Sequence, residues 1–393
     1  MGYGHSSRDS GKDSGSDDVR GQDGRMWPIV VRQPQDPVEA VVEADAYDAS
    51  LNARTMLVRG PLFGVAAQDA GQAPRWRVVV PVAAGFPQEA RDSLNSRLWD
   101  RARNEAGSRE ERRALLAAVD RLERERVDEL TVLGTRYRVV RAEEYAGAGP
   151  DGIEQPRPTD PEPADPDWER ATKERRVDAD LVLDPEAPLT PVQAAERLML
   201  RDLAYTGKRF PQRVRDESRR ALRTHPDVLL MPAAFRVVEG RMLENGSAGG
   251  WQMGGSLHTT AHDARRALDF SLTWFAPRQR GLIPWQTEAP MADARTVSAE
   301  GDEEMVGKLA EYVRAADRLR AERANQVEIG GCVHRICRAR RLLRWGPDGP
   351  EGPRPTDTES DPHPPSRIHP RMDEDGVIHY DEEGDEGDDD LES

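Results

Sequence analysis

Charged side chains that recur 197 positions apart are the residues of this 393-residue chain that could do chemistry. The recurring residues on a predicted helix are Asp120, Arg121, Glu125 and Arg126 with Asp317, Arg318, Glu322 and Arg323, and those on a predicted strand are Arg138 and Arg141 with Arg335 and Arg338. Paired carboxylates can serve acid–base catalysis. However, Arg121 and Glu125 stand four residues apart, which favours a solvated or helix-to-strand ion pair. No His, Cys or Ser recurs in this block, which excludes a nucleophile–histidine pair repeated in both copies.

These residues belong to an internal repeat. Residues 118–160 and 315–357 align without a gap and are identical at 20 of 43 positions, and weaker matches extend back to Pro37 and Pro191. Such a repeat has to be recognised before any fold is assigned. The predicted organisation is a disordered segment (1–26), repeat domain 1 (27–161), a linker (162–189), repeat domain 2 (190–357) and a disordered acidic tail (358–393).

Hydrophobic periodicity predicts the elements that position the recurring charges. Each copy shows the order helix, two strands, two helices, two strands, with Val38, Val41 and Val42 at helical spacing in the first helix. In the next two helices of copy 1 the spacing predicts that Leu94, Leu98 and Leu122 point inward. This order favours an α+β fold in which helices cover an antiparallel sheet. The fold class that we expect is therefore α+β, with two related tandem domains.

A Gly-Pro-Asp-Gly turn and a proline-rich arm follow the last strands of each copy. The arms contain Pro156, Arg157 and Pro158 in copy 1 and Pro353, Arg354 and Pro355 in copy 2. Prolines at this spacing predict extended, polyproline-like backbone. We favour an arm that closes its own domain, and the alternative is a preformed ligand for the sibling copy or for another protein.

Cys332, His334 and Cys337 could suggest a metal site. However, side chains alternate between the two faces of a strand, so Cys332 and His334 are expected on one face and Cys337 on the other. His258 and His262 share a helical face, yet Thr260 and Asp263 indicate a helix cap there. The glycines of 246–256 lack the Lys-Ser/Thr of a phosphate loop. We therefore predict no metal, no cofactor and no catalytic residue.

The strand 130–145, the Gly-Pro-Asp-Gly turn and the Pro-Arg-Pro arm resemble an uncharacterised family of streptomycete and other actinobacterial proteins, in which this motif often occurs twice per chain. The resemblance implies an actinobacterial, cytoplasmic protein and brings no activity, cofactor or catalytic residue with it. Copy 2 departs from the pattern at Cys332, His334 and Cys337.

The two copies and the tail differ in charge. The net charge is −16, but residues 372–393 hold 12 acidic residues and no basic one, which leaves only −4 for the rest. Copy 2 carries a candidate basic patch of Arg340, Arg341, Arg344 and Trp345, which the tail could screen.

From these patterns we predict a non-enzymatic, cytoplasmic protein used for protein interaction or regulation, with a protein partner and without a membrane segment. The alternative is a nucleic-acid-associated protein that uses the Arg-rich face of domain 2, and the third hypothesis is an acid–base enzyme. The sequence leaves the oligomeric state open.

Overall fold

The computed structural model describes residues 26–168, 177–242, 248–286, 292–297 and 303–380. Helix α1 (Pro37–Asn52) begins where the Asp36 side chain accepts a hydrogen bond from the backbone of Glu39, with Pro37 at the first position. The rest of the first half consists of β1 (Thr55–Asp69), β2 (Trp76–Ala84), α2 (Pro87–Asn104), α3 (Arg109–Arg124), β3 (Glu129–Val132), β4 (Thr135–Gly149) and β5 (Gly152–Ile153).

The second half begins with α4 (Pro191–Arg201), where the backbone N–H of Thr190 donates to the side chain of Gln193 at 3.1 Å. It continues with α5 (Gln212–Thr224), β7 (Asp227–Leu230), β8 (Ala234–Met242), β9 (Ala248–Met253), α6 (Ala261–Phe270), the π-helix η1 (Ser271–Phe275), α7 (Ala276–Gln279), α8 (Glu303–Glu322), β10 (Gln326–Ile329), β11 (Cys332–Gly346), β12 (Gly349–Pro350) and α9 (Pro355–Glu359). The order helix, strand, strand is thus the same at 118–145 and 315–342.

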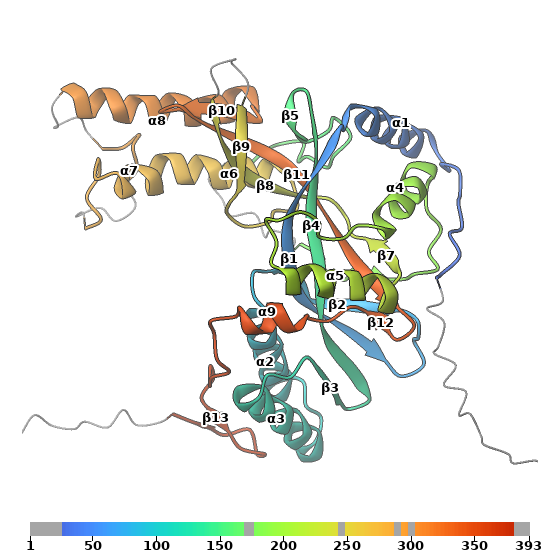
Figure 1. Cartoon of the computed structure of the whole chain (residues 1–393). Helices are drawn as coiled ribbons and strands as arrows, with labels where there is room; N and C mark the ends of the chain where they lie inside the picture. Colours follow the sequence, from blue (N-terminus) through green and yellow to red (C-terminus); the bar gives the residue numbers. More distant parts are fainter. Residues whose placement is uncertain (1–25, 169–176, 243–247, 287–291, 298–302, 381–393) are drawn as a thin grey trace, which may run out of the picture.

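One 12-stranded sheet contains strands of both halves. Its main path is β6-β2-β1-β4-β11-β8-β9, where β6 (Val182–Leu183) comes from the linker, and its strand pairs are antiparallel. Helices α2 and α3 cover one end of the curled sheet, and α6 and α8 cover the other (Figure 1). The predicted α+β class with antiparallel strands and covering helices is confirmed. The domain boundaries stay a prediction.

Each end of the sheet has its own core, and a third core joins the halves. Leu94, Leu98 and Leu122 are buried between α2, α3 and the first strands, as the periodicity predicted. A matching cluster in the second half contains Leu268, Leu319 and Ile336. The central cluster combines residues of both halves, namely Leu62, Trp76, Val82, Val140, Ala142, Ala234, Ala339, Leu343 and Trp345 among others.

Strands β4 and β11 pair where the two halves meet. Their register places Glu144 opposite Arg341, with Glu143 opposite Leu342 and Tyr145 opposite Arg340. Glu144 and Arg341 are also 197 residues apart, so they are equivalent positions of the two copies of the repeat. Because equivalent residues face each other, exchanging the two halves would leave the antiparallel pairing unchanged.

The valines at helical spacing in helix α1 are exposed. None of its residues, all of which are described, is buried, and Val38, Val41 and Leu51 are 73%, 60% and 65% exposed. The side that faces the protein carries acidic groups instead: Glu39 pairs with Arg32, and Glu43 accepts a hydrogen bond from the backbone of α4. The helix is held by polar contacts, and its large apolar side chains are exposed.

The expected disorder of residues 358–393 is wrong for the part that is described. Residues 361–380 pack on α2 and α3, where Trp99 stacks on His369 at 4.8 Å and donates to the carbonyl oxygen of Pro370. Glu374 pairs with Arg113 of α3, and β13 (Arg371–Met372) and β14 (Ile378–His379) form a small hairpin. This segment therefore contacts basic residues of the first half, and the expected screening of copy 2 is wrong for it. Residues 1–25 and 381–393, also predicted to be disordered, lie outside the described residues.

The turn that follows β11 generates the first prediction. Gly349 has a φ of +107°, and a Cβ there would lie 2.6 Å from Nε1 of the buried Trp76. Gly134 also has a positive φ, of +78°, but nothing lies within 4 Å of its Cβ position. We expect Gly349→Ala to cost about 2 kcal/mol more than Gly134→Ala, because overpacking is added to backbone strain. Urea unfolding of both variants measures this difference, and equal costs would contradict the close contact.

Candidate functional site

Arg138 and Arg335 each bind the turn of the other half. Arg138 Nη1 donates to two carbonyl oxygens of the turn that follows β11, at 3.0 and 3.1 Å. Arg335 Nη1 donates to two carbonyl oxygens of the turn that follows β4, at 2.7 and 3.1 Å. Each guanidinium also lies over an indole of its own half, at 5.1 Å from Trp76 and 4.8 Å from Trp251. The two arginines thus make equivalent contacts, each from its own half to the turn of the other half.

Arg141 and Arg338 repeat this exchange with the proline-rich arms. Arg141 Nε donates to Asp357 of the second arm at 2.7 Å, and Arg338 Nε donates to Asp160 of the first arm at 2.9 Å. The expectation that each arm closes its own domain is therefore wrong for these ionic contacts, which join each arm to the sibling half.

The arms also have contacts within their own halves. Arg157 pairs with Glu154, and Arg354 pairs with Glu351 in the corresponding way. Pro156 lies in backbone without regular structure, and Pro158 lies at a turn, whereas Pro353 precedes and Pro355 begins the short helix α9. The predicted extended backbone therefore ends before Pro355.

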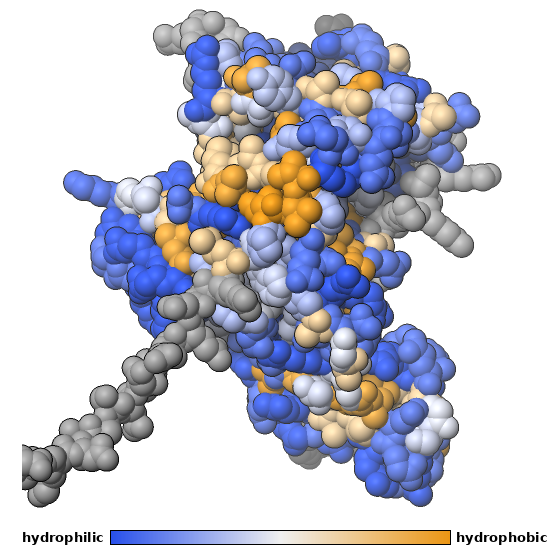
Figure 2. Space-filling model, turned by 90° about the vertical axis from the view of Figure 1, so that its right-hand side faces the viewer, coloured by the Kyte–Doolittle hydropathy of each residue, from blue (hydrophilic) through white to orange (hydrophobic). Residues whose placement is uncertain are grey.

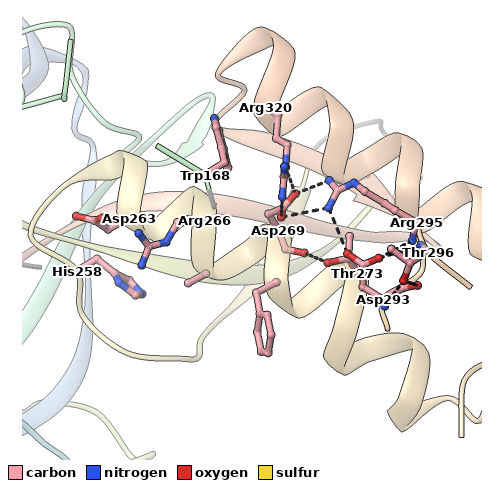
Figure 3. Close-up of a pocket in the computed structure, with 12 residues that line it drawn as sticks. Trp168, His258, Asp263, Arg266, Asp269, Thr273, Asp293, Arg295, Thr296 and Arg320 are labelled. Atoms are coloured by element: carbon pink, nitrogen blue, oxygen red, sulfur yellow. Dashed lines mark hydrogen bonds and ion pairs between the residues drawn. The ribbon is translucent and has the colours of Figure 1, made fainter. Parts of the chain in front are cut away.

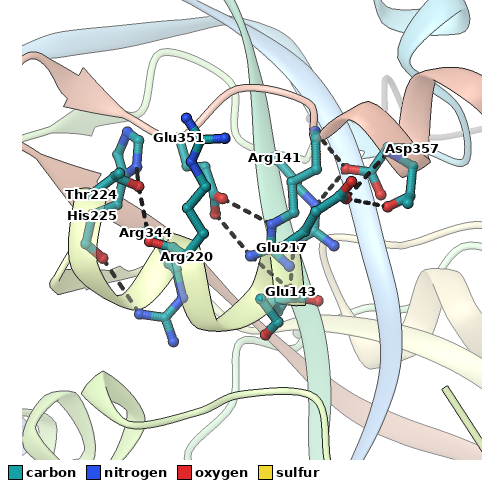
Figure 4. A network of polar contacts seen from close by, with 12 residues as sticks. Arg141, Glu143, Glu217, Arg220, Thr224, His225, Arg344, Glu351 and Asp357 are labelled. Carbon is teal, nitrogen blue, oxygen red and sulfur yellow. Dashed lines mark hydrogen bonds and ion pairs between the residues drawn. The ribbon is translucent and has the colours of Figure 1, made fainter. Parts of the chain in front are cut away.

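Glu143 is the carboxylate at the centre of a buried polar network (Figure 4). It accepts hydrogen bonds from Arg141 and, at 2.5 Å, from the hydroxyl of Tyr205, and Arg354 lies 3.7 Å away. Burial alone would raise the pKa of Glu143, but the two guanidinium groups and the hydrogen bonds outweigh it and lower the pKa. The group is therefore held as a carboxylate, which accepts protons poorly.

Glu144 and Arg341, at the centre of the β4–β11 pairing, have separate buried partners. Arg236 donates to Glu144 at 2.8 Å, and Arg59 also binds it at 3.1 Å. Arg341 binds both carboxylate oxygens of Asp178, at 2.5 and 2.9 Å. Asp178 belongs to the linker, which thus supplies the counter-ion for the strand.

The candidate basic patch is not a surface patch. Arg341, Arg344 and Trp345 are buried, and Arg344 donates to carbonyl oxygens of Arg201, Leu203 and His225. Arg340 lies over the ring of Tyr145 and binds Glu154 and Glu196. The expected Arg-rich face of domain 2 is thus wrong for these residues, because the fold uses their charges internally.

The recurring residues of the helices lie apart from this network. Arg121 binds Glu125 at 3.0 Å and Arg318 binds Glu322 at 3.4 Å, both on exposed helix faces, as expected for i,i+4 pairs. Asp120 pairs with Arg124, and Asp317 pairs with Arg295 at 3.0 Å. Arg126 and Arg323 donate to backbone carbonyls of segments that follow the arm of the other half, at Thr358 and Ala164.

The candidate metal residues do not form a common site. Cys337 is buried among Ala146, Ile153 and Val238, and burial raises the pKa of its thiol. His262 bonds to the carbonyl oxygen of Asp167 and lies edge-on to Trp168. In the described part of the chain no three His, Cys, Asp or Glu residues gather as metal ligands would.

A cavity of about 640 Å³ opens beside α6 and α8 (Figure 3). At its centre Asp269 is held by Arg295 at 2.6 Å and Arg320 at 2.8 Å. Burial would raise the pKa of Asp269, but hydrogen bonds from Arg320 and Arg295 lower it. Trp168 and Phe270 also line the cavity. Charges of opposite sign thus pair across its wall, and this pairing holds Asp269 as a carboxylate. His258 also lines the cavity.

The feature that sequence reasoning missed is an apolar face on α1 and α4. The exposed large hydrophobic side chains of the two contacting helices are Val38, Val41, Val42, Tyr47, Leu51, Leu198 and Met199. Figure 2 views this side of the molecule and shows apolar surface gathered near its middle. The sequence carried no clear signal for this face, because acidic and apolar residues are mixed around α1, with Asp48 on the same side as Val41 and Leu51.

Membership of a family follows from comparison of the chain with known proteins. Residues 36–360 match the sequence profile of DUF5954, a family of unknown function, and the chain belongs to this family. No curated protein and no solved structure matches it significantly. The resemblance to an uncharacterised family is thereby confirmed, whereas its taxonomic range and motif stay predictions. None of the described helices is long and apolar enough to cross a membrane.

The buried network predicts that replacing two recurring arginines lowers the free energy of unfolding by different amounts. Removing Arg141 leaves Glu143 and Asp357 without their shared cation in a buried site, whereas Arg121 pairs with Glu125 on the surface. We expect Arg141→Ala to destabilise the fold by about 3–5 kcal/mol. Arg121→Ala should cost about 0–1 kcal/mol. Chemical denaturation tests this, and similar losses for the two variants would contradict the difference.

The lowered pKa of Glu143 predicts an acid-sensitive fold. Because the folded state holds this carboxylate at a lower pKa than the unfolded state, its contribution is complete above the unfolded value of about 4.3 and is lost as pH falls below it. We expect Glu143→Gln to lose less stability than the wild type between pH 5 and pH 3. Thermal unfolding across this range measures the slopes, and parallel slopes would argue against the prediction.

Proposed function

We propose that this member of the family is a protein-interaction module that binds a partner through the α1–α4 face. The observation that carries the proposal is that Glu39 and Glu43 hold α1 in place, through Arg32 and the backbone of α4, while Val41, Tyr47 and Leu51 are exposed to solvent. Large apolar side chains gathered on one exposed face are typical of an interaction surface.

The ionic network supports a non-enzymatic role. Arg138, Arg141, Arg335 and Arg338 all bind groups of the sibling half, so their recurrence has a structural explanation. Glu125 and Glu322 pair with arginines on exposed helix faces, and neither lines the cavity beside α6 and α8. Acid–base catalysis is therefore the less favoured function for these carboxylates.

The proposal includes the origin and the location of the protein. We hold that the two halves arose by tandem duplication, which the reciprocal contacts of their matched residues support. We also place the protein in an actinobacterial cytoplasm, as its sequence motif and its two cysteines suggest.

Photo-crosslinking in the native cell tests the interaction. Benzoylphenylalanine is placed at Leu51 on the α1–α4 face, and at Leu133 as a control, because this residue is also exposed but lies in the β3–β4 turn. We expect a discrete polypeptide adduct at position 51 that Leu198→Asp suppresses at least tenfold, and no such adduct at position 133. Equal labelling at the two positions, or no adduct at position 51, would overturn the proposal.

A further inference from the structure

We infer that the partner that covers the α1–α4 face is a second copy of this chain, so that the protein is a homodimer. The inference rests on the proposed function and adds the identity of the partner. It follows from the composition of the segments outside the described residues and from the area, charge and internal symmetry of the face.

The chain's own undescribed segments do not have the composition to cover the face. Residues 1–25 contain only Met1, Tyr3 and Val19 as large apolar residues, and 381–393 contain only Leu391. The internal segments 169–176, 243–247, 287–291 and 298–302 together contain only Leu243 and Met291. An apolar face of this kind is stabilised by apolar side chains that displace water from it. The cover must therefore come from another chain.

The area of the face agrees with that of a dimer interface. The seven exposed side chains present roughly 700 Å², more than the ~300–600 Å² of the largest apolar patch on a typical monomer. A specific interface buries about 800 Å² on each partner. The face therefore needs only a narrow rim of neighbouring residues, such as the exposed Val30 and Val31, to reach that size.

Charge opposes the approach of two such faces only weakly. The large apolar side chains are uncharged, and Glu39 and Glu43 of α1 are engaged with Arg32 and the backbone of α4. Asp48 is exposed on the same side of α1 as Val41 and Leu51, and salt screens the repulsion between such surface carboxylates. Most of the net charge of −16 belongs to residues 372–393. The described part of that segment lies with α2 and α3, at the far end of the molecule from α1 and α4 in Figure 1.

The two helices that form the face occupy matching places in the two halves. Each begins with Pro after a capping residue, at Asp36 in α1 and at Thr190 in α4, and the helices contact one another. In a twofold dimer the same surface is used by both chains. A face made of two similar helices can meet its own copy as four helices packed together, with aliphatic side chains on both sides.

The test measures the molar mass of the full chain in solution. A monomer has a mass of 43.8 kDa, and light scattering or sedimentation equilibrium separates it from a dimer. We expect the wild type to be dimeric at micromolar concentration. The double variant Val41→Asp, Leu198→Asp should raise the dissociation constant at least 100-fold, because it places two charges in each apolar face. Leu133→Asp, at a comparably exposed site, should leave the dimer unchanged.

Two results would overturn the inference: a wild type that stays at 43.8 kDa up to 100 μM, or a dimer that the double variant leaves intact. Circular dichroism and urea unfolding check that the variants fold. We expect them to fold, because the substituted positions are exposed. A monomeric wild type that still gives the adduct at position 51 in cells would reject the second copy and leave the interaction module standing. Loss of the adduct as well would reject both.

Discussion

The antiparallel pairing of β4 with β11 is the interaction on which the rest of the structure depends. Without it each half would end its sheet at a strand with unpaired backbone groups, which invites uncontrolled association. With it, 12 strands form one sheet, and the central hydrophobic cluster closes with residues of both halves. The pairing also brings Glu144 and Arg341 into the interior, where each requires the partners that Arg236 and Asp178 supply.

The junction also contains many buried charged groups. Removing charged groups from water is costly, and the cost is offset only when the geometry of the pairs is good. The network meets this condition by exchange: arginines of each central strand bind the turn and the arm that follow the central strand of the other half. Either half alone would leave these guanidinium groups without several of their acceptors. The two halves therefore form one unit, and the charges that recur in the sequence are the charges that join them.

The α1–α4 face has the opposite character. It is apolar, it lies outside the exchanged contacts, and it occupies the side of the molecule away from the α2–α3 layer (Figures 1 and 2). Hydrophobic clusters and exchanged ionic contacts assemble the rest of the fold, whereas α1 and α4 leave seven large apolar side chains exposed. Association through this face is the function that we propose for them.

The sequence by itself determined the α+β class, the antiparallel strands and the inward positions of residues such as Leu94 and Leu122, because hydrophobic periodicity is a local property. It also identified the recurring arginines and the i,i+4 pair of Arg121 and Glu125. Only the tertiary structure decided that Arg341 and Arg344 are buried, since burial depends on which strand and which linker residue arrive beside them. The same holds for α1, whose spacing showed only valines on a helix, while the contacts of Glu39 with Arg32 and of Glu43 with α4 left those valines exposed.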